Sequence, residues 1–328
     1  MFENFINIHD FSILYKTAKE GKLNLILSKL TSSKQGKVEK SWEHTKKLPV
    51  NWYNIPEVKW RWNHLISGDA RIDYYEYIFH KYFPNKKNLK ALSLGCGTGH
   101  NELEWAKFGA FKNIDAYDLS KTRIEFAKKE AVKKGYSDTI NYRIADVYKI
   151  KERNNYYDIV LVEHSLHHFS PLKDLLLQIN SFLKADGFFI VNEFVGPTRF
   201  QWTDRQLEII NGLLSILPTQ YKTKTNGSIK RKVFKPSRLS MILNDPSEAI
   251  ESSNILFLLR KTFEIKEVKE YGGTILMMLF SEIAHNFLSK NNEAKKFLDI
   301  CFDTEDILLQ SKDIQSDFVV AVCKKKQD

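Results

Sequence analysis

The chain has 328 residues, of which 43% are hydrophobic and 27% charged, a balance typical of a globular protein large enough for one or two cores. It contains no run of about 18 apolar residues, and its N-terminal sequence MFENFINIHDF lacks the cationic lead and continuous apolar stretch of a signal peptide, so we expect a cytoplasmic location and no membrane span. The three cysteines, Cys96, Cys301 and Cys323, are scattered, which disfavours a disulfide framework or a thiolate metal site.

The net charge of +10 could indicate an anionic partner, such as nucleic acid, a membrane surface or a phosphorylated substrate. The lysines are spread through most of the chain, so a generally lysine-rich composition explains most of this charge. The exception is segment 219–238, TQYKTKTNGSIKRKVFKPSR, which has seven basic residues and no acid. A solvated loop around Asn226-Gly227 is its simplest interpretation, and a site for a phosphorylated or nucleotide-linked substrate, or for RNA, is the alternative.

Residues 1–88 are predicted to be helical and are rich in aromatic residues. From residue 89 onward, apolar runs of strand length alternate with segments of helical period, the pattern of a parallel sheet covered by helices on both faces. The expected strands are 90–95, 113–118, 140–145, 157–163 and 187–194, and the expected helices between them are 99–109, 120–135 and 171–184. In the last of these helices, Ser170 is the expected N-cap and Pro171 the first helical residue.

Two more strands are expected late in the chain, at 263–271 and 317–323. The segments 200–262 and 274–312 have helical period and are too long for simple loops, so we expect them to be insertions that form a lid. The predicted organisation is an N-terminal extension (1–88), a Rossmann-like core (89–199), a lid insertion (200–262) and a C-terminal part with the last two strands (263–328).

The sequence LSLGCGTGHNE places Gly95, Gly97 and Gly99 between the first strand and the following helix. Glycine at such a place lets the backbone approach a ligand closely and adopt conformations that other residues resist. The spacing G-x-G-x-G does not fit the dinucleotide-binding pattern, whose third glycine would fall at His100.

Two acidic residues follow the next two strands, Asp118 after the second and Asp146 after the third. Ligands of open α/β sheets bind at the carboxyl ends of the strands, where both acids are expected. The carboxylate of Asp118 can accept hydrogen bonds from both hydroxyls of a ribose, and that of Asp146 can accept one from the exocyclic amine of adenine. Together with the glycines they predict an adenosine-shaped site, although each part alone could be structural, with Asp118 capping a helix that begins at Ser120.

From Leu89 to about Phe194 the chain resembles the core of the class I S-adenosylmethionine-dependent methyltransferases of the small-molecule type. The resemblance implies an α/β fold with a Rossmann-like, seven-stranded, mostly parallel sheet and an antiparallel last strand, to which this chain adds a helical N-terminal segment and helical lid insertions. It also implies S-adenosyl-L-methionine as the cofactor. The residues that it places around this methyl donor are Gly95, Cys96, Gly97, Gly99, Asp118, Leu119, Asp146, Val147 and Glu163.

One position departs from the pattern of this family. The acid that is usual two residues before the first glycine is replaced by Ser93, so the usual partner of the donor's methionine amino group is missing.

The loop after the fourth strand, EHSLHHF, places His164, His167 and His168 at the ligand-binding edge. It lacks the Asn/Asp-Pro-Pro-aromatic sequence typical of enzymes that methylate nucleobase amines, and it resembles the loop of small-molecule methyltransferases. Methyl transfer to a hydroxyl requires a base, for which His164 and His167 are the candidates, unless one of the His167–His168 pair only packs against the sheet. No metal is expected, because the helix starts after Ser170, so the spacing of His164 and His168 lies in a loop.

The sequence NEFVGPTRFQWTDRQLE after the fifth strand resembles that of a bacterial group of methyltransferases linked to glycan or secondary-metabolite pathways. Glu193 at the strand end could orient the acceptor and act in catalysis, and Arg199 could bind a carboxylate or phosphate. A Glu193–Arg199 salt bridge is the structural alternative. Thr203 is expected to cap a helix that begins at Asp204.

Further contacts to the acceptor are expected from the lid and from the N-terminal aromatic residues, which could equally belong to the core. The residues predicted to bind the acceptor are Trp60, Tyr75, Arg199, Arg238, Ser247 and Glu248.

These features predict a methyltransferase that acts on a small polar metabolite, such as a sugar, a glycan precursor or a secondary metabolite, with a hydroxyl acceptor ahead of an amine. A nucleic-acid methyltransferase and a non-catalytic donor-binding protein are the alternatives.

Overall fold

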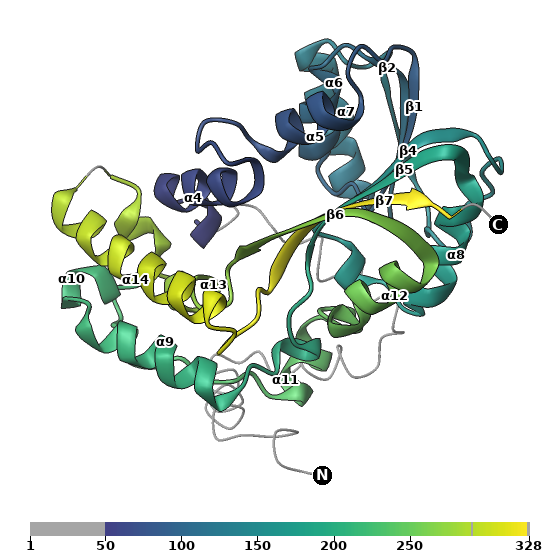
Figure 1. Ribbon diagram of the computed structural model, residues 1–328. Helices are drawn as coiled ribbons and strands as arrows, with labels where there is room; N and C mark the ends of the chain where they lie inside the picture. The colour runs from purple at the N-terminus through teal and green to yellow at the C-terminus, as the bar shows by residue number, and fades with distance from the viewer. Residues whose placement is uncertain (1–49, 290, 327–328) are drawn as a thin grey trace.

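A seven-stranded sheet forms the centre of the computed structural model, which describes residues 50–289 and 291–326 (Figure 1). The strands lie in the order β3-β2-β1-β4-β5-β7-β6. Strands β1 to β5 pair in parallel, and β7 pairs antiparallel with both β5 and β6, which confirms the predicted Rossmann-like α/β fold. The strands are β1 (Leu89–Leu94), β2 (Phe111–Asp118), β3 (Ile140–Ile144), β4 (Tyr157–Glu163), β5 (Leu183–Phe194), β6 (Phe263–Gly272) and β7 (Phe318–Lys325).

Helices cover both faces of the sheet, and since successive side chains of a strand point to opposite faces, both sets of side chains are buried. Leu92 and Val160 pack with α8 (Leu172–Phe182) and α12 (Ile255–Thr262). Ala91 and Leu161 pack on the other face, with α6 (His100–Ala106) and α7 (Lys121–Lys134). Polar side chains of the central strands are therefore concentrated at the strand ends, where Asp118, Glu163 and Glu193 lie.

The helix boundaries agree with the sequence only in part. Thr203 caps α9 (Asp204–Ile216) as predicted, and its side chain accepts a hydrogen bond from Gln206 N. The predicted N-cap at Ser170 was wrong. Helix α8 begins one residue later, at Leu172, because Pro171 keeps an extended ψ of 123° and takes the N-cap position itself. The helix also ends earlier, so that β5 starts at Leu183, four residues before the predicted start.

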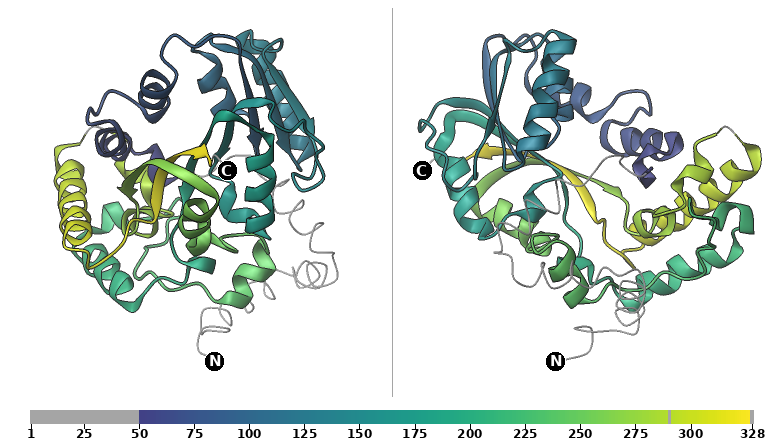
Figure 2. Two further views of the ribbon diagram at one scale, coloured as in Figure 1. Left: turned by 45° about the vertical axis from the view of Figure 1, so that its right-hand side comes forward. Right: turned by 180° about the vertical axis from the view of Figure 1, so that it is seen from behind.

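Helices also form the N-terminal part and the insertions, as predicted. Part of the expected N-terminal extension, residues 1–49 with Trp42, lies outside the described residues. In both views α9, α10, α13 and α14 form a helical layer away from β1, β2 and β3 (Figures 1 and 2). The helices of these parts are η1 (Trp52–Asn54), α4 (Pro56–Ser67), α5 (Tyr74–Tyr82), α10 (Thr219–Lys222), α11 (Arg238–Asn244), α13 (Leu276–Phe280) and α14 (Asn292–Gln310). No helix within 50–289 or 291–326 is long and apolar enough to cross a membrane.

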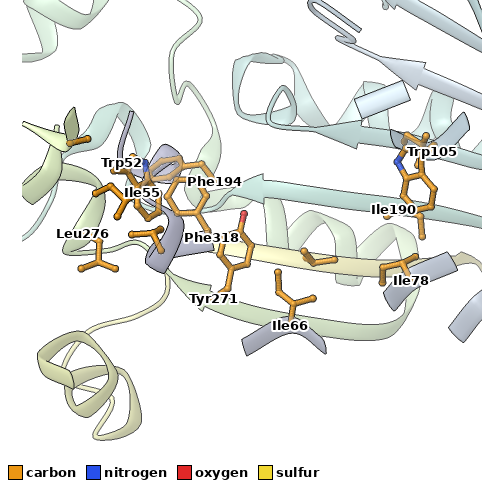
Figure 3. Close-up of a cluster of buried hydrophobic side chains, with 14 of the residues drawn as sticks. Trp52, Ile55, Ile66, Ile78, Trp105, Ile190, Phe194, Tyr271, Leu276 and Phe318 are labelled. Carbon is orange, nitrogen blue, oxygen red and sulfur yellow. The ribbon is translucent and has the colours of Figure 1, made fainter. Parts of the chain in front are cut away.

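Several of the N-terminal aromatic residues belong to the core rather than to a binding site. Trp62 lies 4.7 Å from Trp52 and 5.0 Å from Tyr271, measured between ring centroids. Trp52, Tyr271 and Phe318 lie together in Figure 3, where β6 and β7 meet the N-terminal segment. The aromatic contacts join the segment before the sheet to its last two strands.

A buried ion pair links α4 to α14. Glu305 is completely buried and accepts hydrogen bonds from the backbone N–H groups of Gly273, Ile275 and Leu276. Its Oε2 lies 2.9 Å from Nη1 of Arg61. Removing one member of a buried pair leaves the other charge uncompensated, which is more costly than the pair is stabilising.

We predict that Glu305→Ala lowers the free energy of unfolding by about 3–5 kcal/mol. Urea denaturation measures the change. Asp299→Ala is the control on the same helix, because the exposed Asp299–Lys295 pair should contribute no more than about 0.5 kcal/mol. Equal effects of the two substitutions would contradict the role of the buried pair.

Candidate active site

The glycine loop after β1 adopts backbone conformations that favour glycine. Gly95, Gly97 and Gly99 have φ values of +74°, +55° and +80°. The N–H of Gly95 donates to Tyr117 O at 2.8 Å, which fixes the loop against β2. A Cβ added at Gly95 would lie 2.6 Å from Cβ of Ser165, so the loop and the segment after β4 are in close contact. Cys96, between Gly95 and Gly97 in the loop, is buried.

Asp118 joins the end of β2 to the glycine loop. Its Oδ2 accepts from Gly97 N at 2.9 Å and its Oδ1 from Ser120 N at 2.8 Å. Ser120 is the N-cap of α7, and Asp118 accepts from the N–H of this cap residue, so part of its role is structural, as the alternative proposed. Each carboxylate oxygen retains a lone pair for a further donor. Burial raises the pKa of Asp118, although its backbone partners oppose this shift.

A cavity of about 240 Å³ lies at this edge of the sheet. Its wall combines residues of the glycine loop and the start of α7, of the segment after β4 and of the lid insertion. They are Gly95, Asp118, Arg123, His164, Ser165, His168, Asp245 and Glu248. The fold thus brings together four predicted site residues, Gly95, Asp118, His164 and Glu248.

The predicted adenine-binding residues lie one strand away, after β3. Asp146 Oδ1 accepts from Tyr148 N at 3.1 Å, and Lys149 Nζ lies 3.4 Å from its Oδ2. Val147 is buried. Leu119 follows Asp118 at the end of β2. None of these residues lines the cavity.

Glu163 is buried at the end of β4 and does not line the cavity. It accepts hydrogen bonds from the Tyr74 hydroxyl and, at 3.3 Å, from Trp105 Nε1. Burial raises its pKa to about 8. Tyr75, predicted to bind the acceptor, donates instead to Asn101 Oδ1 at 2.8 Å on the helix after the glycine loop.

His164 is one of two histidines that line the cavity. It has a positive φ of 54°, and its N–H donates to Asn192 O at 2.7 Å, which holds the residue at the end of β4. The residue is exposed, but partial desolvation by the surrounding protein lowers the pKa of His164, which favours the neutral ring that can accept a proton.

His167 lies between two carboxylates. Its Nδ1 pairs with Oε1 of the completely buried Glu193, and its Nε2 lies 3.4 Å from Oε1 of Glu248. Burial alone would lower the pKa of His167, but the two carboxylates raise it to about 10. His167 is therefore protonated at neutral pH, which makes it a poor base.

Glu193 also fixes the segment after β4. It accepts from Ser165 N at 2.9 Å and from Leu166 N at 2.5 Å. The alternative Glu193–Arg199 salt bridge was wrong. The terminal nitrogens of Arg199 donate to the carbonyl oxygens of Glu248 and Pro246, at 2.9 and 2.7 Å, and so hold the lid segment.

The remaining predicted acceptor residues are dispersed. Ser247 is buried, and its hydroxyl donates to Asp245 Oδ1 at 2.6 Å and lies 3.1 Å from Nδ1 of His168. Trp60 is 48% exposed on α4, and Arg238 is exposed on α11. Neither lines the cavity.

Sequence reasoning did not assign four residues of the cavity wall, namely Arg123, Ser165, His168 and Asp245. Arg123 could have been found, because it lies in the first turn of the helix that follows Asp118, at the same edge of the sheet. Asp245 could not, since no local pattern indicates which residue of the lid reaches the cavity.

His167, His168 and Glu248 lie close enough together to hold a metal ion. A metal requires a neutral imidazole, whereas the carboxylates on both sides of His167 favour its protonated form. The donor set therefore fits a metal poorly, and the absence of a metal stays a prediction.

Comparisons with known proteins agree with this geometry. Residues 92–191 match the family model of a methyltransferase domain. The chain is 29% identical over 146 residues to a malonyl-[acyl-carrier protein] O-methyltransferase of Halalkalibacterium halodurans. The aligned region covers 42% of this chain and 54% of the relative. The chain is 28% identical over 105 residues to a ubiquinone biosynthesis O-methyltransferase of Pelagibacter ubique, with 32% and 42% covered. The chain thus spans about half the length of the curated relatives it matches.

Among solved structures, the chain is similar in fold to a geranyl diphosphate C-methyltransferase from Streptomyces coelicolor A3(2), with a TM-score of 0.52. The two share 12% identity, and the similarity covers 90% of this chain and 99% of the other. The glycine loop, the sheet order and the matched domain identify residues 92–191 as a class I S-adenosylmethionine-dependent methyltransferase domain.

We predict that Gly99→Ala destabilises the protein by about 2–4 kcal/mol, because an added methyl group would overlap the Tyr142 hydroxyl in addition to straining φ. The matched control is Gly109→Ala, where φ is also positive, +61°, but no atom lies within 4 Å of the new methyl group. Thermal denaturation compares the two. A loss of stability in Gly109→Ala as large as that in Gly99→Ala would show that backbone strain alone accounts for the effect.

Proposed function

We propose that this chain is an enzyme that transfers a methyl group from S-adenosylmethionine to a small polar acceptor. The observation that carries the proposal is Asp118, a buried carboxylate on the wall of the cavity with lone pairs available to the two ribose hydroxyls of the donor. The positive-φ glycines next to it would let the backbone approach the methionine half. Asp146 and Val147 would receive the adenine, one strand away.

The cavity supports a neutral or cationic acceptor better than a phosphorylated one. Its wall carries three carboxylates, Asp118, Asp245 and Glu248, against one arginine, Arg123, and the lowered pKa values of His164 and His168 favour their neutral forms. We favour a hydroxyl acceptor over an amine, because a neutral histidine is available as a base. The O-methyltransferase names of two relatives support an oxygen acceptor.

The basic segment 219–238 gives little support to a phosphorylated substrate or RNA. Lys230 is buried and donates to the carbonyl oxygens of Met278, Leu279 and Ser281. Two other lysines of the segment pair with nearby acids, Lys224 with Glu282 and Lys235 with Asp204. The segment thus resembles a structural part of the lid, and a nucleic-acid methyltransferase is the weaker candidate.

In the proposed reaction, the acceptor oxygen attacks the methyl carbon in line with the sulfonium, whose carbon–sulfur bond breaks to leave a neutral thioether. The hydroxyl proton passes to an imidazole nitrogen of His164. Alignment of the two substrates would provide on the order of 7–11 kcal/mol, and the base a further factor of about 10²–10⁴. Glu193 and His167 act as positioning residues, since they fix the segment that carries His164.

We predict that Asp118→Asn weakens the binding of S-adenosylhomocysteine about 10- to 100-fold, because the amide loses charged acceptor oxygens for the ribose. Isothermal titration calorimetry measures this affinity. Asp186→Asn, an exposed change at the opposite end of β5, is the control and should leave the affinity unchanged. Unchanged binding by Asp118→Asn would mean that the donor site is elsewhere.

We predict that His164→Gln lowers turnover about 10²- to 10⁴-fold while donor affinity changes little. Formation of S-adenosylhomocysteine with a panel of hydroxylated metabolites measures turnover, and exposed His80→Gln is the control. Because partial desolvation lowers the pKa of His164, kcat at saturating donor and acceptor should change little from about pH 8 down to 6.5, the ordinary histidine value, and fall below it. Full activity of His164→Gln would exclude His164 as the base. A wild-type chain that binds the donor but turns over no acceptor would favour the non-catalytic alternative.

A further inference from the structure

The missing acid of the glycine-loop region has a counterpart on the neighbouring helix. At position 93 on β1, where the related family carries an acid, the hydroxyl of Ser93 donates to Oε1 of Glu102 at 2.5 Å. Both residues are buried, with 3% and 1% of their surfaces exposed. Glu102 lies on α6, which begins directly after Gly99. The helix thus presents a carboxylate to the place on the strand where the family's acid would be.

One oxygen of this carboxylate has no partner. Oε2 of Glu102 is buried without a hydrogen bond, and none of the ion pairs in residues 50–289 and 291–326 includes Glu102. Burial, together with the nearby Asp118, raises the pKa of Glu102 to about 7. A buried carboxylate oxygen without a donor is costly and calls for an explanation, such as an ordered water, an ion or a ligand.

The neighbouring buried carboxylate, in contrast, has its partners in the fold. Glu163 accepts from Tyr74 and from Trp105. The charges of both Glu102 and Asp118 act on the glycine loop, since after burial they help to raise the pKa of Cys96. Of Glu102 and Glu163, Glu102 is thus the carboxylate that keeps an oxygen without a hydrogen bond next to the strand that leads into the glycine loop.

We propose that Glu102 holds the α-ammonium group of the donor's methionine part, and that Ser93 orients it. The chain would have exchanged the acid and the hydroxyl between strand and helix. An ammonium group supplies both a positive charge and N–H donors, and Oε2 of Glu102 has neither kind of partner within the protein. This assignment rests on the proposed function, because it requires that the donor is S-adenosylmethionine.

Two ligands separate this role from a structural one. S-adenosylhomocysteine carries the ammonium group, whereas 5′-methylthioadenosine has the same nucleoside and thioether but no amino-acid part. Glu102→Gln should weaken the binding of S-adenosylhomocysteine about 10- to 100-fold and leave the affinity for 5′-methylthioadenosine within about twofold of the wild type. Calorimetry measures both affinities. Equal weakening of both ligands, or of neither, would overturn the assignment.

An exchange variant tests the same idea without removing the charge. Ser93→Asp combined with Glu102→Ser places the acid back on the strand, and it should bind S-adenosylhomocysteine within about threefold of the wild type. Glu102→Ser alone should be as weak as Glu102→Gln. Failure of the exchange variant to recover affinity while it still binds 5′-methylthioadenosine would contradict the proposal. If the wild-type chain bound neither nucleoside, the proposed function itself would fail, a result distinct from the others.

Discussion

The arrangement of the site depends on the buried carboxylate of Glu193. A charge removed from water must be paired and hydrogen-bonded, and Glu193 meets this need with two N–H groups of the segment after β4 and with the imidazole of His167. The segment therefore takes the one path that presents these donors to the end of β5. That path places His164 and Ser165 on the cavity wall. The same imidazole also meets Glu248, so one buried charge connects the sheet to the lid.

The two halves of the site follow a common physical rule. Because the sheet is buried on both faces, its central strands accept polar groups mainly at their ends. On the side of the first two strands, the glycine loop, Asp118 and Glu102 bring backbone N–H groups and carboxylates to the proposed donor. On the side of β4 and β5, Glu193, His167 and the lid bring a neutral His164 to the proposed acceptor. The methyl group would pass between these halves.

The features that were predictable from the sequence are local. The apolar run IVLV of β4 lies in a strand buried on both faces, and Gly95, Gly97 and Asp118 could be placed because they adjoin predicted strand ends. The features that were missed depend on contacts between distant segments. Arg199 holds lid carbonyls about 50 residues away rather than Glu193, and Trp60 is exposed where its neighbour Trp62 is in the core. Periodicity shows which face is apolar, but it does not show which distant side chain will meet a buried charge.

The most direct test of the account is a crystal structure of the chain with S-adenosylhomocysteine. We predict that the ribose hydroxyls bind Asp118, that the adenine lies beside Asp146 and Val147, and that the thioether sulfur faces the cavity near His164. A nucleoside bound away from the carboxyl ends of β1, β2 and β3, or a sulfur that points away from the cavity, would contradict the central claim that this edge of the sheet is a methyl-transfer site.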